Sequence, residues 1–212
     1  MKYFVYFLLL FFNTMSSQFV VAIHYQKQTL LTKDLVKGLP DSLKDEMIKQ
    51  VNEIKSESVL YIQGNENLYH VKSKDVIKNN DNLKNNKNDK TGATIISSSF
   101  EHSSKEKKLI KNFKNNNYTI KENGKLVAHK LPKAIWKYTS KTKKVAGYNC
   151  FEATTTFNNH KLTVFFTREL WTKGSPDKLP FLDGVILEYN YSHFYVKAVN
   201  VDLQVPLITN FL

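Results

Sequence analysis

The chain has 212 residues, a formal net charge of +12 and only one cysteine, which excludes an intramolecular disulfide. With 42% of its residues hydrophobic, it can form a single domain of ordinary size that is stabilised by its apolar core.

The N-terminus has the pattern of a secretory signal peptide. Lys2 provides a positive charge, residues 3–12 form an apolar run of ten, and small or polar residues follow over 13–18. A membrane-spanning helix needs about 20 apolar residues, so this run is short for one. We predict cleavage near Ser16 or Ser17, giving a signal peptide over 1–17, a mature domain over 18–212 and no transmembrane segment after cleavage. An uncleaved anchor is the alternative.

The next two elements are a strand and an amphipathic helix. Residues 19–28 alternate between apolar and polar as a half-buried strand does. After Pro40, apolar residues recur at spacings of four, four and three, which places them on one helical face: Leu43, Met47, Val51 and Ile54. We expect this face to pack against a sheet.

The middle of the chain predicts hairpins around a polar loop. Residues 58–63 and 68–71 read as a hairpin around Gly64-Asn65. Residues 72–92 are rich in Asn, Lys and Asp and are expected to form a flexible surface loop. Strand patterns resume at 93–100 and 118–121, and Asn123-Gly124 predicts a tight turn into a strand over 125–131.

The C-terminal half is almost entirely strand pattern. Five runs are rich in aromatic and β-branched residues: 135–139, 147–157, 160–167, 185–189 and 193–201. Asn158-Asn159 fits a tight turn between two of them. The predicted fold is mainly β with one amphipathic helix (α+β), as a curved antiparallel sheet or partial barrel with the helix against one face.

The positive charge is concentrated between His102 and Tyr148, where thirteen lysines face only two glutamates. Such a block is either a solvated surface or a contact for an anionic lipid, polysaccharide or protein. Candidate contacts are Lys121, Lys125, Lys133, Lys137, Lys143 and Lys144. Nucleic acid is not expected as a partner, because the block lacks arginines that read base edges.

The residues predict no catalytic centre, cofactor or metal site. The six histidines are scattered singly, and no phosphate-binding glycine loop or Cys-x-x-Cys is present. Cys150 is expected to be a buried, inert thiol, although a thiolate paired with a distant histidine is an alternative. Arg168-Glu169 and Asp183-Gly184 are either structural or ligand contacts.

Several motifs after residue 135 resemble, in order and spacing, the GLPGLI family of secreted Bacteroidetes proteins. They are Trp136, Gly147-Tyr148-Asn149-Cys150, Phe166-Thr167-Arg168-Glu169-Leu170 and Phe181-Leu182-Asp183-Gly184-Val185-Ile186. The last of these stands at the signature hexapeptide, with Phe181 for its first Gly and Asp183 for its Pro. The positions that carry the resemblance most directly are Trp136, Gly147, Tyr148, Cys150, Thr167, Glu169 and Gly184.

The resemblance implies an exported protein of the periplasm, outer-membrane face or extracellular space, in a family with no established activity. Together with the lysine block, it favours a non-enzymatic module that binds lipid or another anionic envelope component. One alternative is a hydrolase-like enzyme whose site is assembled from distant residues. Another is a partner of outer-membrane machinery.

Overall fold

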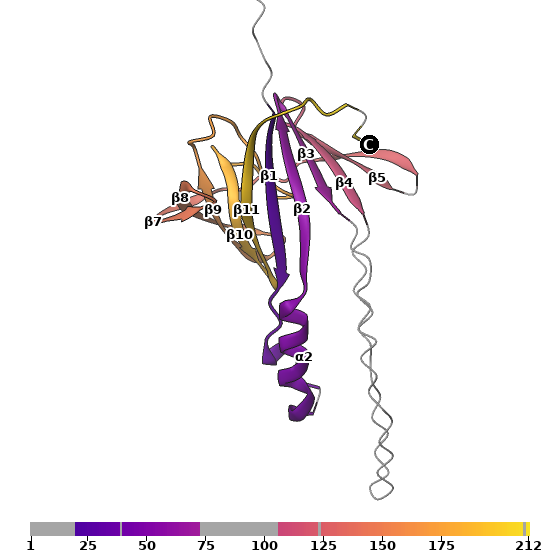
Figure 1. Ribbon diagram of the computed structural model, residues 1–212, viewed down its shortest axis with the longest axis vertical. Helices are drawn as coiled ribbons and strands as arrows, with labels where there is room; N and C mark the ends of the chain where they lie inside the picture. Colours follow the sequence, from indigo (N-terminus) through magenta and orange to yellow (C-terminus); the bar gives the residue numbers. More distant parts are fainter. Residues whose placement is uncertain (1–19, 39, 73–105, 123, 210) are drawn as a thin grey trace, which may run out of the picture.

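The computed structural model describes residues 20–38, 40–72, 106–122, 124–209 and 211–212. Their strands form one antiparallel sheet of eleven, in the order β6-β5-β4-β3-β2-β1-β11-β10-β9-β8-β7 (Figure 1). The strands are β1 Val20–Thr29, β2 Lys55–Gln63, β3 Glu66–Val71, β4 Lys107–Asn112, β5 Asn117–Glu122, β6 Lys125–Lys130, β7 Lys137–Val145, β8 Tyr148–Phe157, β9 His160–Thr167, β10 Val185–Tyr191 and β11 Phe194–Val205. The predicted fold class, mainly β with one helix in a curved antiparallel sheet, is confirmed.

The turns follow the local sequence closely. Asn158 and Asn159 both have positive φ, at 44° and 63°, and join β8 to β9 as a two-residue turn. Gly64, with φ of 57°, occupies the predicted turn between β2 and β3. The signal peptide, the strand over 93–100 and nearly all of the 72–92 loop fall outside the described residues.

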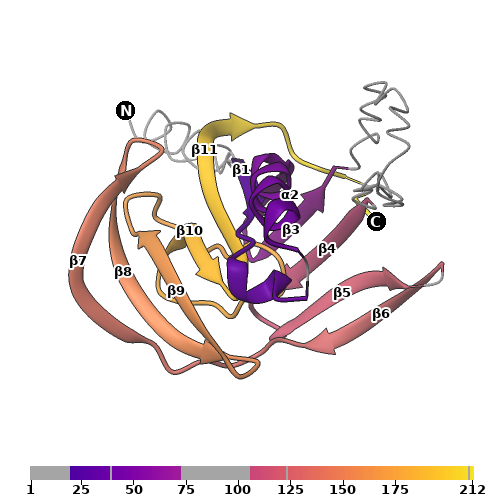
Figure 2. The same cartoon turned by 90° about the horizontal axis from the view of Figure 1, so that it is seen from below.

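The sheet is curved and not closed. Its two edge strands, β6 and β7, are consecutive in the chain and are joined by residues 131–136. Seven peptide units span at most about 25 Å, so the end of β6 and the start of β7 cannot lie farther apart than that. In Figure 2 the strands β7 to β9 arc along one side of the molecule and β5 and β6 lie on the other.

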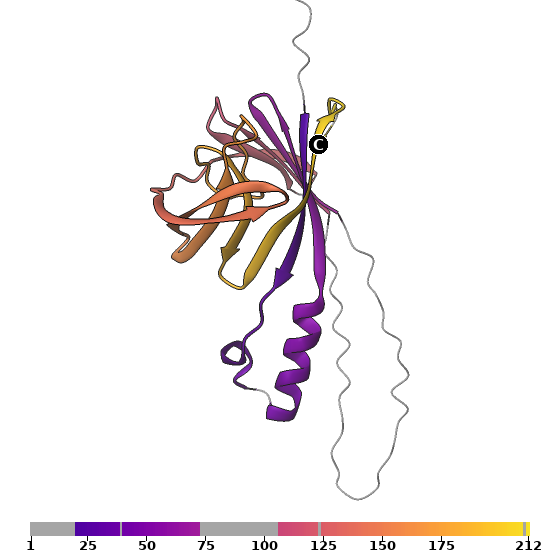
Figure 3. The same cartoon turned by 60° about the vertical axis from the view of Figure 1, so that its left-hand side comes forward.

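The helix α2, Asp41–Glu53, does not cover the sheet as predicted. It follows the short 3-10 helix η1, Lys33–Val36, and extends beyond the ends of β1 and β2 (Figure 3). Leu43, at the start of its apolar stripe, is 53% exposed. The strands β1 and β2 pair directly along their length, so the helix belongs to a long connection between them and has no sheet face beneath it.

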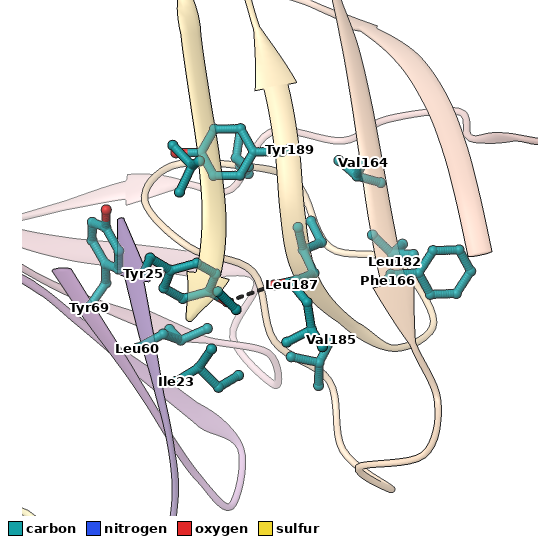
Figure 4. Close-up of a cluster of buried hydrophobic side chains, with 14 of the residues drawn as sticks. Ile23, Tyr25, Leu60, Tyr69, Val164, Phe166, Leu182, Val185, Leu187 and Tyr189 are labelled. Atoms are coloured by element: carbon teal, nitrogen blue, oxygen red, sulfur yellow. Dashed lines mark hydrogen bonds between the residues drawn. The ribbon is translucent and has the colours of Figure 1, made fainter. Parts of the chain in front are cut away.

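One face of the sheet carries the core. Ile23, Leu60, Tyr69, Leu109 and Ile120 are successive partners across β1 to β5, and all are buried. The core continues onto β9 and β10 (Figure 4), where its members include Val164, Phe166, Leu187 and Tyr189. The Tyr25 hydroxyl donates to the Ile186 carbonyl at 2.6 Å, which links β1 to β10 across β11.

The connection between β9 and β10, residues 168–184, packs into this core through Leu179 and Leu182. A buried lysine of β4 holds it there: Lys111 donates to the carbonyl and hydroxyl of Ser175, with Nζ 2.6 Å from Oγ. Asn67 of β3 accepts from the Ser175 amide at 3.0 Å. We call residues 168–184 the connector.

No helix among the described residues is long and apolar enough to cross a membrane.

Candidate functional site

The second face of β8 to β11 carries polar side chains in two parallel rows. In the first row, Glu152, Phe165, Glu188 and Lys197 are successive partners across the four strands. In the second row, the partners are Thr154, Thr163, Asn190 and Tyr195. Because directly paired residues point to the same side of a sheet, all eight share one face. We call these two rows the polar face.

The alternation of these strands explains why the rows form. The residues between them, Ala153, Val164, Tyr189 and Val196, are also mutual partners, and all four are buried in the core. A strand with apolar residues on one side must place the intervening side chains on the other. The core therefore fixes the register that aligns the two glutamates.

The two glutamates of the first row are almost fully buried. The side chains of Glu152 and Glu188 are 10% and 6% exposed. Glu152 accepts a hydrogen bond from the Thr139 hydroxyl at 2.9 Å and lies 3.7 Å from Lys141 Nζ. One strand separates the glutamates, so their backbones lie about 10 Å apart, and Phe165 stands between them.

Lys143 shows that the sheet coils strongly toward the polar face. It lies on β7, yet its ammonium forms an ion pair with Glu188 on β10. Three strand spacings in a flat sheet measure about 14 Å, which is too far for these two side chains to meet. The same ammonium lies 4.0 Å from the centroid of the Phe165 ring, so it covers both the ring and the carboxylate.

Glu188 has a second neighbour besides Lys143. Its Oε2 is buried and has no well-formed hydrogen bond to any described residue. Burial, the negative charge of Glu188 and a hydrogen-bonding contact with its side chain raise the pKa of Tyr195 to about 12. The tyrosine therefore keeps its proton at neutral pH, and its hydroxyl is a hydrogen-bond donor beside the Glu188 carboxylate.

A pocket of about 360 Å³ adjoins the polar face. It is lined by His160, Lys161, Thr163, Asn190 and Ser192. Thr163 and Asn190 belong to the second row, so the pocket opens on the same side of the sheet as the glutamates. The other three residues come from the strand ends and turns, where Ser192 has a φ of 53°. We call the polar face and this pocket together the polar trough.

The alternative of a reactive thiolate at Cys150 does not fit this arrangement. Cys150 is buried, and burial is the main cause that raises the pKa of its thiol to about 12. Such a thiol stays protonated at neutral pH, so the buried, inert thiol is the correct alternative. Among the described residues no group of three or more His, Cys, Asp or Glu could hold a metal ion.

The other candidate ligand contacts, Arg168-Glu169 and Asp183-Gly184, form ion pairs and hydrogen bonds with neighbouring residues. Asp183 lies 2.9 Å from Lys173, and this contact lowers the pKa of Asp183. Arg168 donates to the Asp183 carbonyl at 3.1 Å. Glu169 accepts from the Asn149 side chain at 2.7 Å.

The six candidate lysines divide by exposure. Lys121, Lys125, Lys133, Lys137 and Lys144 are exposed, as an anion-contact surface requires. Lys143 is the exception, because it is half-buried against Glu188 and belongs to the polar trough. Sequence reasoning did not single out Glu152 and Glu188. One signal could have found them. Each glutamate lies within a predicted strand, next to apolar residues that face the core.

The motif positions gather at one end of β8 to β10. Thr167 is buried, and a Cβ on Gly184 would lie 2.5 Å from its carbonyl oxygen. Trp136 is half-buried and donates to the Phe181 carbonyl at 2.8 Å. Gly147 takes a φ of 88° next to Tyr148 at the β7 to β8 turn. These contacts are structural and are not part of the polar trough.

Comparison with known proteins identifies a different lineage from the one the motifs resemble. The family described as N-glycanase peptide, N-terminal domain (PNGase F-II) matches residues 54–207. The chain belongs to this family. No curated protein matches it.

Solved structures agree in fold. The structure of PNGF-II in space group C2 superposes with a TM-score of 0.56 at 20% identity, covering 90% of this chain and 28% of that one. The structure of PNGF-II in space group P21 gives the same TM-score and identity, with coverages of 89% and 29%. This chain therefore spans less than a third of the length of PNGF-II.

The GLPGLI resemblance is wrong, and the function drawn from it is corrected with it. The motif positions make packing contacts around β8 to β10, and the family match over residues 54–207 overturns the lineage drawn from them. The N-glycanase match also contradicts the non-enzymatic module for lipid or anionic envelope components, and it fits the hydrolase-like alternative better.

Proposed function

We propose that this chain acts in the removal of N-linked glycans from glycoproteins and that the glycan meets it along the polar trough. The observation that supports this most is the match of residues 54–207 to the N-terminal domain family of the N-glycanase. That range includes all of β8 to β11, which form the trough.

The chemistry of the trough suits a sugar. Sugar hydroxyls both donate and accept hydrogen bonds, so a site for them needs donors and acceptors side by side. The Glu188 carboxylate is an acceptor, and Tyr195 and Lys143 are donors next to it. Thr163 and Asn190 add a hydroxyl and an amide at the pocket.

Glu188 is also the residue of the trough best suited to hydrolysis. A general base needs a carboxylate oxygen that accepts the proton of a water molecule, and we assign this role to Oε2 of Glu188, which is buried in this structure and would have to become exposed when the glycan binds. Tyr195 remains protonated up to about pH 12 and can supply a donor on the other side of the reaction. Glycan binding and glycan hydrolysis are two separate roles of the trough, so they are measured in separate assays.

The test compares an N-glycosylated protein with the same protein whose acceptor asparagine is replaced by glutamine. We expect the chain to bind the glycosylated form at least about tenfold more tightly, which corresponds to about 1.4 kcal/mol. Glu188→Gln should lose most of this preference, because an amide cannot supply the same acceptor oxygens. Calorimetry measures binding, and mass spectrometry of the released glycan measures hydrolysis.

Glu169→Gln is the matched control, since Glu169 lies outside the trough and contacts Asn149. It should bind as the unmodified chain does, and circular dichroism checks that both variants fold. Equal binding of the two proteins with no glycan released would overturn the proposal. Release that depends on Glu188 would assign the hydrolytic step to this chain.

A further inference from the structure

We infer that the polar trough selects glycans that carry acidic groups over neutral glycans. This rests on the proposed function and adds the class of glycan to it. The observation behind it is the distribution of charge around the pocket and the two rows.

Five lysines face the trough, from three different strands. Lys137 pairs with Thr154 and so extends the second row onto β7. Lys161 lines the pocket, and Lys197 ends the first row on β11. Lys141 and Lys143 lie beside the two glutamates. Five lysines against two glutamates leave this face of the described residues positive.

The glutamates do not cancel the outer lysines. Lys143 neutralises Glu188, and Thr139 and Lys141 contact Glu152. By contrast, Lys137, Lys161 and Lys197 are exposed and make no ion pair within the part of the chain that the structure describes. Lys161 thus places one uncompensated ammonium group at the pocket, and Lys137 and Lys197 place two more at the ends of the rows that the pocket adjoins.

Protection of a sheet edge does not explain this set. Edge strands often carry lysines that prevent pairing with another chain, and β7 is an edge strand. Lys161 and Lys197, however, lie on β9 and β11, which are paired on both sides. Since interior strands need no such protection, we assign these two lysines to charge complementarity with an anionic ligand.

A glycan is the ligand that fits both the charge and the walls. Hydroxyl and amide side chains from Thr163, Asn190 and Ser192 line the pocket and match sugar hydroxyls. A carboxylate on the same glycan would interact with the exposed lysines within one Debye length, about 10 Å at 0.1 M salt. The neutral part of the glycan would then determine placement and the acidic part would determine preference.

The experiment uses two glycopeptides with one peptide sequence. One carries an N-glycan capped with sialic acid, and the other carries the same glycan after removal of the sialic acid. Calorimetry at 20 and 200 mM NaCl should show at least about fivefold tighter binding of the capped form at low salt. The advantage should shrink at high salt, because screening weakens exposed charge interactions.

Matched charge variants locate the effect. Lys161→Gln with Lys197→Gln should abolish the preference, so that the capped and the neutral glycopeptide bind with equal affinity. Lys125→Gln with Lys130→Gln removes the same charge from exposed residues of β6, at the opposite end of the strand order, and should keep the preference.

The outcomes separate this inference from the proposed function. Equal binding of the two glycopeptides overturns the inference alone, and so does an equal loss in both double variants. If neither glycopeptide binds, both the inference and the proposed function are overturned. A third probe, a glycan-free peptide with added glutamates, overturns glycan selection if it binds as tightly as the capped glycopeptide.

Discussion

Lys111 and Lys143 belong to the basic segment between His102 and Tyr148. Lys111 is buried and Lys143 is half-buried, whereas most lysines of that segment are exposed. Lys111 has no exposed surface, and it donates to Ser175 and to the Leu179 carbonyl in the core. Lys143 is half-buried over Glu188. A count of charges along a chain cannot separate such residues from solvated ones, because only the strand register decides which face each side chain takes.

The burial of Lys111 predicts a specific dependence of stability on pH. Burial lowers the pKa of its ammonium well below the usual 10.5, and the partners that hold it are neutral oxygens. Between the lowered pKa and about 10.4 the unfolded chain binds more protons than the folded one, so stability rises with pH across that window.

We therefore expect the free energy of unfolding to increase from pH 7 to 9.5 by more in the unmodified chain than in Lys111→Met. Urea unfolding at each pH measures this. Lys125→Met, which removes an exposed lysine of β6, corrects for the general loss of a positive charge. The range stops at 9.5 because burial raises the pKa of Tyr25, whose effect begins above about 10 with the opposite sign. Parallel curves for all three proteins would contradict the prediction.

Among the elements, the connector departs furthest from regular structure, and two glycines make its course possible. Gly174 accepts from the Ile186 amide at 2.9 Å and donates to the Gly184 carbonyl at 3.1 Å. Gly184 has a φ of 154°, a conformation that few residues other than glycine adopt. The connector thus returns alongside the start of β10 and delivers Leu179 and Leu182 to the core.

Gly184→Ala should destabilise the protein by several kcal/mol. The new Cβ would meet the Thr167 carbonyl oxygen at 2.5 Å and the Phe166 ring at 2.8 Å, and the unusual φ alone costs about 1–3 kcal/mol. Gly147→Ala is the matched control, since Gly147 also has a positive φ but faces open space. Denaturant unfolding should show a clearly larger loss for Gly184→Ala. Equal losses would mean that the backbone conformation alone matters at both glycines.

The elements could be predicted where local patterns decide them. The strand His160–Thr167 and the Asn158-Asn159 turn coincide with the sequence prediction, because alternation and left-handed turn residues are local signals. The strand β4 escaped prediction because its alternating positions include three lysines, one of them buried. The helix α2 has a clear apolar stripe, but no local pattern states whether a sheet face lies beneath it.

At the scale of the whole molecule, the site depends on features that no local pattern contains. Alternation alone can predict that Glu152 and Glu188 leave the core on the same face. Their alignment across β9 depends on register, and the contact between Lys143 and Glu188 depends on coiling across four strands. The pocket forms where the β8–β9 turn and the β10–β11 turn lie at the same end of the sheet. These are non-local consequences of topology, so the sequence prediction named Lys143 only as an anion contact and did not name Glu152, Glu188 or the pocket.

The shared core predicts that the two halves of the sheet unfold together. Leu60 on β2 is fully buried in the same cluster as Val164 on β9 and Leu187 on β10, and Tyr25 bonds across to β10. Leu60→Ala should cost about 2–5 kcal/mol through lost burial and a cavity. Hydrogen exchange of the most protected amides should then accelerate as much in β9 and β10 as in β2 and β3, because they exchange through one global opening.

Val199→Ala, at a half-exposed residue of β11, should leave these rates nearly unchanged. If Leu60→Ala accelerates exchange in β2 and β3 and spares β9 and β10, the halves open independently and the common core does not couple them. In that case the polar trough would be carried by an independently stable unit. With coupled opening, the trough instead depends on packing contributed by strands on the far side of the sheet.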